Sequence, residues 1–310
     1  MKRTIISSVI MIVTTINFVF AQQKPAVSSG NVDRIGQFQS NYVAPRDIDI
    51  WLPEGYSTAK KYAVLYMHDG QMLYDANSTW NKQAWEMDEV ASKLIANGQV
   101  EPFIIVSIWN VGEKRHTDYF PQKPYESLNT DQKEFVTKQL IEKGRIKEPF
   151  APQSDNYLMF MVNELKPFID KNYAVKSDRK HTFIAGSSMG GLISMYALCE
   201  YPKVFGGAAC LSTHWPGIFS VENNPIPQSF NDYLKSKLPK LKKSKLYFDY
   251  GDQTLDALYP PLQKEVDKLL KSQNPKMKYK WETRFFEGKD HSENAWKERV
   301  HIPLLFLMND

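Results

Sequence analysis

Residues 181–191 read HTFIAGSSMGG, and this stretch decides the fold. An apolar run of strand length ends at Ala185, and a run typical of a helix begins at Met189. Between them, residues 186–190 match the G-x-S-x-G pattern, in which the central serine lies on a tight turn from strand to helix. The stretch therefore predicts a strand, a turn and a helix that hold the Ser188 hydroxyl at the end of the strand, beside the positive end of the helix dipole. Ser187 is interpreted as a neighbour that fills space in the turn.

Segments of strand length and helix length alternate along the rest of the chain. The predicted strands span 47–52, 62–67, 103–109, 181–185, 206–211, 245–250 and 280–286, and the predicted helices span 82–97, 155–171, 189–201, 256–272 and 292–300. Nearly continuous apolar strands separated by helices favour an α/β fold, with a mostly parallel sheet covered on both faces. Ligands of such sheets bind at the carboxyl ends of the strands. The polar stretch 112–154 fits this alternation less well and is interpreted as an insertion or lid over the site.

Composition places the chain among globular proteins. It has 310 residues, of which 42% are hydrophobic and 24% charged, and these proportions exclude intrinsic disorder. No repeat or linker divides residues 22–310, so we expect a single domain. The net charge of +4 includes two basic residues at the N-terminus, which excludes the strongly basic footprint of a nucleic-acid-binding protein.

The first 21 residues have the pattern of a signal peptide. Lys2 and Arg3 precede an apolar run at 5–20. Val19 and Ala21 then place small residues at the positions that a signal peptidase reads. We therefore expect cleavage after Ala21 and a protein of the periplasm or the medium, without a membrane anchor. Export permits a disulfide between Cys199 and Cys210, but both thiols have apolar neighbours and are interpreted as core residues.

Ser188 needs a base, because a serine hydroxyl is a poor nucleophile until its proton is removed. When the nucleophile lies on such a turn, the acid and the histidine follow it in the chain. His291 comes after the last predicted strand and is the predicted general base. His301 lies beyond the next helix, close to Pro303, and is interpreted as structural.

The acid has two candidates after the strand at 245–250. Asp256 opens the next predicted helix and is preferred, because a carboxylate there can face the end of the sheet. Asp252 is the alternative, and a pair of serine and histidine without a firm acid also remains open. If Asp256 is not the acid, it is interpreted as an ordinary helix-capping aspartate.

Two backbone N–H groups are predicted to stabilise a developing oxyanion. Met189 supplies one as the residue after the nucleophile, and Gln71 supplies the other from the loop after the strand at 62–67. Five further residues at strand ends are predicted to line the pocket: His68, Asn110, Arg115, His214 and Trp215. The pair His68 and Asp69 lacks a third metal ligand at a useful spacing, so we expect no metal and no cofactor.

Five tryptophans in or near strand-end loops are candidates for stacking on a sugar ring. They are Trp80, Trp85, Trp109, Trp215 and Trp296. Together with export, they favour a small-molecule or carbohydrate substrate.

Three motifs resemble the esterase D-like branch of the α/β-hydrolases, which includes feruloyl, acetylxylan and enterochelin esterases. They are MHDGQMLYD (67–75), IAGSSMGGLISMYAL (184–198) and EGKDHSENAW (287–296), within a similarity spanning roughly residues 40–308. The resemblance implies an α/β-hydrolase fold and a serine carboxylic-ester hydrolase with Ser188 and His291 as its core pair. The chain departs from the family at Thr254, where feruloyl esterases tend to carry the acidic residue.

The expected function is hydrolysis of acetyl or feruloyl esters on carbohydrate, through an acyl-enzyme on Ser188. Three alternatives remain at this point: a periplasmic siderophore esterase of the enterochelin type, an acyltransferase, and a catalytically silent binding protein with the same fold.

Overall fold

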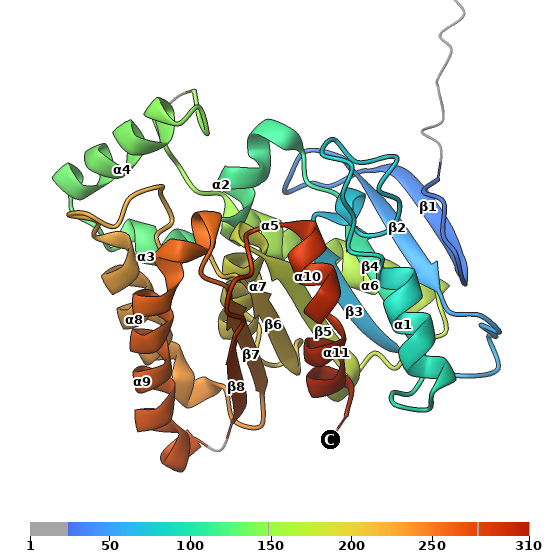
Figure 1. Ribbon diagram of the computed structural model, residues 1–310. Helices are drawn as coiled ribbons and strands as arrows, with labels where there is room; N and C mark the ends of the chain where they lie inside the picture. The colour runs from blue at the N-terminus through green and yellow to red at the C-terminus, as the bar shows by residue number, and fades with distance from the viewer. Residues whose placement is uncertain (1–23, 148, 278, 310) are drawn as a thin grey trace, which may run out of the picture.

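The computed structural model describes residues 24–147, 149–277 and 279–309, so the predicted signal peptide lies outside the described residues. Eight strands of the described chain form one sheet in the order β1-β2-β4-β3-β5-β6-β7-β8 (Figure 1). The strands are β1 (Asn31–Phe38), β2 (Arg46–Leu52), β3 (Ala63–His68), β4 (Phe103–Ile108), β5 (Thr182–Ser187), β6 (Gly207–Leu211), β7 (Lys245–Tyr250) and β8 (Lys280–Phe285). Pairing is antiparallel for β1 with β2 and for β2 with β4, and parallel elsewhere. The predicted α/β class and the mostly parallel sheet are confirmed.

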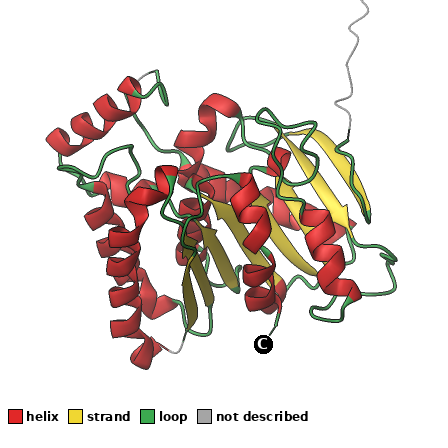
Figure 2. Cartoon of the chain, viewed as in Figure 1, coloured by secondary structure: helices red, strands yellow, loops and turns green. Residues whose placement is uncertain are grey.

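Helices cover both faces of the sheet (Figure 2). Val64 and Tyr66 of β3 point into a core shared with α5, α7, α8 and α9, whereas Leu65 and Met67 point into a second core shared with α1, α10 and α11. This alternation explains why the strand is apolar throughout. The helices are α1 (Met87–Ala96), α5 (Ser154–Phe160), α6 (Lys166–Asn172), α7 (Met189–Glu200), α8 (Ile226–Lys237), α9 (Tyr259–Met277), α10 (Glu293–Arg299) and α11 (His301–Met308).

The polar stretch 112–154 is mostly helical. It contains η2 (Gly112–Lys114), α2 (Arg115–Tyr119), α3 (Gln122–Glu126) and α4 (Thr130–Glu142). In Figure 1, α2 lies over the upper ends of the central strands, whereas α4 extends away from the sheet. The stretch thus lies at the edge where ligands of α/β sheets bind. Its action as a lid stays a prediction.

Several elements differ from those predicted. The helix expected at 82–97 begins only at Met87, and the helix expected at 155–171 is interrupted by a π-helical turn, η3 (Met161–Leu165). The strand β1 and the helices α8 and α11 were not expected. His301, interpreted as structural, begins α11 with its side chain exposed.

Cys199 and Cys210 are both free and buried, as expected of core thiols. No helix among residues 24–147, 149–277 and 279–309 is long and apolar enough to cross a membrane.

Candidate active site

Ser188 lies on a strained turn between β5 and α7. Its backbone has φ 58° and ψ −120°, which is an unfavourable conformation for a residue with a side chain. A Cβ at Gly186 would lie 2.8 Å from the carbonyl carbon of Gly190, so glycine is required where the turn closes on itself. The amide of Ser188 donates to the carbonyl of Leu211 on β6, at 2.9 Å. The turn therefore has the geometry that the G-x-S-x-G pattern indicates.

Asp256, and not Asp252, contacts His291. The Nδ1 atom of His291 lies 2.6 Å from Oδ1 of Asp256, whose side chain is fully buried in η6 (Thr254–Leu258). Asp252 instead accepts a bond from the amide of Gly288, at 2.8 Å, close to the surface. Thr254 also has a defined place, because its hydroxyl accepts a hydrogen bond from the amide of His291 at 3.0 Å.

Tyr259 is a residue of the site that the sequence analysis missed. Its hydroxyl lies 2.9 Å from Nδ1 of His214 and is also hydrogen-bonded to Ser188. Burial raises the pKa of Tyr259 well above its ordinary value, which outweighs the opposite effect of Ser188, so the hydroxyl remains protonated. The Tyr259 ring also meets the ring of His291 edge-on, with centroids 5.8 Å apart.

The two predicted oxyanion donors lie on adjacent elements. Met189 is the first residue of α7, where helix N–H groups lack an intrahelical partner. Gln71 lies in η1 (Gly70–Met72), directly after β3, which pairs with β5. A Cβ at Gly70 would lie 2.6 Å from the carbonyl carbon of Ser107, and only glycine permits this approach.

Asp69, just before η1, anchors the segment around the predicted oxyanion site. Its carboxylate accepts bonds of 2.7 Å from Nε and Nη2 of Arg115 and from Nδ2 of Asn110. Burial opposes ionisation, but the Arg115 charge and these hydrogen bonds hold the pKa of Asp69 below its ordinary value. Arg115 and Asn110, predicted to bind substrate, are thus already engaged with Asp69.

Three other predicted pocket residues are buried beneath the site. Nδ1 of His68 lies 2.9 Å from the hydroxyl of Tyr157, and Nε1 of Trp215 donates to Oε1 of Gln263 at 2.7 Å. Both side chains are buried, and their place among the pocket-lining residues stays a prediction. His214 is buried as well, and its amide donates to the carbonyl of Ser188 at 3.2 Å. It supports the turn from below.

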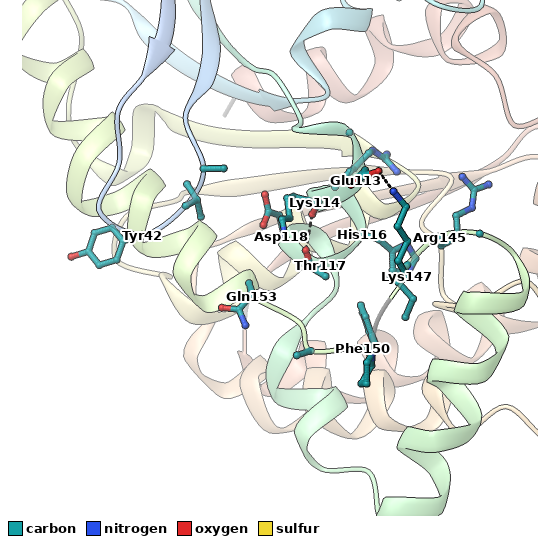
Figure 3. A pocket seen from close by; sticks show the side chains of 18 residues that line it. Tyr42, Glu113, Lys114, His116, Thr117, Asp118, Arg145, Lys147, Phe150 and Gln153 are labelled. Atoms are coloured by element: carbon teal, nitrogen blue, oxygen red, sulfur yellow. Dashed lines mark hydrogen bonds and ion pairs between the residues drawn. The ribbon is translucent and has the colours of Figure 1, made fainter.

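A cavity of about 790 Å³ lies beside α2, whose residues form part of its wall (Figure 3). It is lined by residues 112–118, 144–147, 149–151 and 153, together with residues 42–44. Several charges on its walls are paired, because Lys147 binds Glu113 and Arg46 binds Asp118 at 3.0 Å. The helix α2 thus lines the cavity and also contacts α7, the helix that follows Ser188.

No group of three His, Cys, Asp or Glu side chains in the described part of the chain is arranged to hold a metal ion.

The sheet order and the strained serine turn define an α/β-hydrolase-like esterase fold. Residues 44–302 match the model of the family described as "Putative esterase". The chain belongs to this family.

The relatives include enzymes named for ester hydrolysis. An endo-1,4-beta-xylanase/feruloyl esterase of Xylanibacter ruminicola is 26% identical over 199 residues, which are 62% of this chain and 23% of that protein. Among solved structures, a ferulic acid esterase of Anaeromyces mucronatus is 19% identical, with 93% and 92% of the two chains covered and a TM-score of 0.60. The enterobactin esterase of Shigella flexneri is 16% identical, with 91% and 61% covered and a TM-score of 0.60. The two structures show the shared fold.

Proposed function

We propose that the protein is an exported serine carboxylesterase that hydrolyses acyl esters, of the acetyl or feruloyl type, attached to carbohydrate. The observation that carries the proposal is the 2.6 Å contact between Nδ1 of His291 and the buried carboxylate of Asp256, together with the strained turn that carries Ser188. Membership of the esterase family supports the reaction class. The named activity of the Xylanibacter ruminicola relative supports the ester type, and the first 21 residues support export.

The reaction takes two steps. His291 removes the proton of Ser188, and the serine oxygen attacks the ester carbonyl, while N–H groups of Met189 and Gln71 stabilise the oxyanion. The tetrahedral intermediate expels the alcohol, which takes its proton from His291. Water then attacks the acyl-serine, again through His291, and releases the carboxylic acid and free Ser188.

Trp80 supports a carbohydrate substrate. Of the five tryptophans considered for sugar stacking, Trp85, Trp215 and Trp296 are buried and Trp109 is half-buried, whereas Trp80 is 85% exposed.

The loop that carries Trp80 borders the candidate site. Asn81 donates to Oε2 of Glu293 at 2.8 Å, two residues after His291. An aspartate turn orders the same loop, in which the amide of Asn77 donates to Asp75 at 2.8 Å and the Lys82 ammonium donates to the carbonyl of Asn77 at 2.7 Å. Trp80 is thus a large exposed ring on a loop that contacts α10, and tryptophan is enriched at binding interfaces.

The first experiment compares the mature chain with its Ser188→Ala variant on p-nitrophenyl acetate, methyl ferulate, acetylated xylan and enterobactin. We expect the variant to lose on the order of a millionfold in kcat. The matched control is Ser187→Ala, whose hydroxyl has no role in the reaction and which retains activity. A wild type inert on every ester overturns the proposal, and a preference for enterobactin identifies a siderophore esterase instead.

The role of Trp80 is tested separately with Trp80→Ala. We expect KM for acetylated xylan to rise about fivefold, with kcat/KM for p-nitrophenyl acetate unchanged, because one stacking contact is worth roughly 1 kcal/mol. Trp281→Ala is the control, since Trp281 is half-buried and lies near the amino end of β8, a strand at the edge of the sheet. Equal KM values for wild type and Trp80→Ala on the polymer contradict the stacking role.

A further inference from the structure

Ser212 follows β6 and lies directly behind the carboxylate of Asp256. The Ser212 side chain is fully buried, and no part of the reaction scheme above uses it. We propose that Ser212 is a positioning residue, whose hydroxyl fixes the carboxylate of Asp256 and, through it, the ring of His291. This inference rests on the proposed function.

The hydrogen bonds around Ser212 leave its hydroxyl only one direction. Nε1 of Trp296 and Nη2 of Arg299 each donate to Oγ of Ser212, at 2.9 Å. Neither group accepts a hydrogen bond, so both use the lone pairs of the serine oxygen. The hydroxyl hydrogen is then directed to Oδ2 of Asp256, 2.6 Å away.

The carboxylate of Asp256 is in this way divided between two tasks. Oδ2 accepts from the hydroxyl of Ser212 and from the amide of Gly251, at 2.7 Å. Oδ1 is left for Nδ1 of His291, at 2.6 Å. Two donors on one oxygen prevent the carboxylate from rotating, so the histidine meets it in one geometry.

The backbone of Ser212 indicates that the hydroxyl matters. Its φ is 41°, in the left-handed region, which glycine adopts freely and a residue with a Cβ does not. Glycine would adopt this backbone conformation with less strain than serine. What serine offers in place of glycine is the hydroxyl, which makes the side-chain contacts described above. The Ser212 amide donates to Oδ1 of Asp249 at 3.2 Å, and Asp249 also binds Arg299 at 2.9 Å, so the strained conformation is held from two sides.

The donors to Ser212 come from the helix that follows the histidine. Trp296 and Arg299 lie three residues apart on one face of α10, and the ring of Trp296 meets that of His291 edge-on, with centroids 4.9 Å apart. One helix therefore packs against the base and, through Ser212, orients the acid that pairs with it.

The decisive variant is Ser212→Gly, because it removes the hydroxyl and relieves the backbone at the same time. We expect kcat on p-nitrophenyl acetate to fall at least tenfold, with KM unchanged. The pH profile of kcat/KM changes with it, because the carboxylate no longer meets His291 in one geometry. In proton NMR spectra, the downfield signal of the His291 Nδ1 proton shifts or broadens.

Two further variants separate positioning from general stability. Trp296→Phe keeps an aromatic ring against His291 but removes one donor to Ser212, and it shifts the same NMR signal with a smaller loss of kcat. Ser229→Ala removes a buried serine hydroxyl from α8, where it binds only the carbonyl of Ile226 at 2.8 Å, and leaves both measurements unchanged.

The outcomes distinguish this inference from the proposed function. A Ser212→Gly variant with wild-type kcat, pH profile and NMR signal overturns the positioning role, while the loss of activity in Ser188→Ala still supports the esterase. If Ser188→Ala is as active as wild type, the proposed function fails and the positioning role fails with it.

Discussion

Thr254 and Asp256 divide between them two contacts to one histidine. Thr254 accepts the backbone N–H of His291, and Asp256 accepts its ring N–H. Thr254 stands where the resembling feruloyl esterases tend to carry the acid, and the two-residue displacement leaves a carboxylate within reach because η6 is a tight turn. Asp256 thus brings a carboxylate to the ring of His291 from two residues further along the chain, and it stays the predicted acid.

This arrangement predicts unequal effects for two aspartates in the same loop. Asp256→Asn removes the charge opposite His291 while keeping the shape, and we expect kcat to fall by about four orders of magnitude. Asp252→Asn is the matched control, because the carboxylate of Asp252 accepts exposed hydrogen bonds from the side chain of Gln253 and the amide of Gly288. We expect this variant to retain kcat within a few-fold. Steady-state kinetics on p-nitrophenyl acetate decide the matter, and the reverse ranking of the two variants rejects Asp256 as the acid.

At the residue scale, contiguous motifs were predicted better than contacts between distant segments. Ser188 and Met189 lie in one pattern whose local geometry is fixed by its glycines. Ser212 bonds Asp256 across 44 positions of sequence, and Tyr259 meets His214 across 45, so no spacing rule points to either hydroxyl. Trp215 shows a different limit, because a tryptophan at a strand end has the same sequence pattern whether its ring is exposed or, as here, buried.

At the scale of elements, α2 is joined to the predicted oxyanion segment by the carboxylate of Asp69. Arg115 opens α2, and Asp69 directly precedes η1. The two side chains are 30% and 12% exposed, so their ion pair is only partly screened by water. Gly190 of the serine turn also packs here, since a Cβ on it would lie 3.4 Å from Oδ2 of Asp69. A change at this pair is therefore transmitted to both oxyanion donors.

Breaking the pair is predicted to impair both stability and catalysis. Arg115→Gln leaves Asp69 with a mostly buried, uncompensated charge, and we expect a loss of about 2 kcal/mol in the free energy of unfolding, less than for a fully buried pair. The kcat should fall with it, because the Gln71 segment loses its anchor. Urea unfolding and ester kinetics measure the two effects. The neighbouring Lys114→Gln, on an exposed side chain, serves as control, and equal behaviour of both variants refutes the coupling.

Physical reasons explain why two of the elements were not predicted. β1 reads NVDRIGQF and lies at the edge of the sheet, paired only with β2, so most of its side chains remain partly exposed and no apolar run forms. The central strands are buried on both faces, and their continuous apolar sequences made them predictable. The π-helical turn at Met161–Leu165 depends on packing of the helix against the sheet, which periodicity does not encode.

At the scale of the whole molecule, the carboxyl edge of the sheet contains three buried histidines besides the partly buried His291. His68 ends β3, His116 lies on α2 and His214 follows β6, each at most 7% exposed. Burial lowers the pKa of His68 and of His116 to about 3, with Arg115 adding to the effect, and it lowers the pKa of His214 well below the ordinary value. The fold thus keeps these three rings neutral around the partly buried ring of His291, the predicted base.

Acid should therefore destabilise the whole fold. Below pH 6.5 the unfolded chain protonates these histidines, whereas the folded protein leaves His68 and His116 neutral down to pH about 3. The unfolded state binds more protons in this window, so the free energy of unfolding falls with pH, by up to about 1.4 kcal/mol per pH unit for each histidine. Urea unfolding between pH 7 and pH 4 measures the slope. His116→Gln should reduce it by one histidine's share, and the exposed His301→Gln should leave it unchanged. Parallel curves for wild type and His116→Gln would mean that the buried ring takes up its proton without unfolding, which burial beside Arg115 opposes.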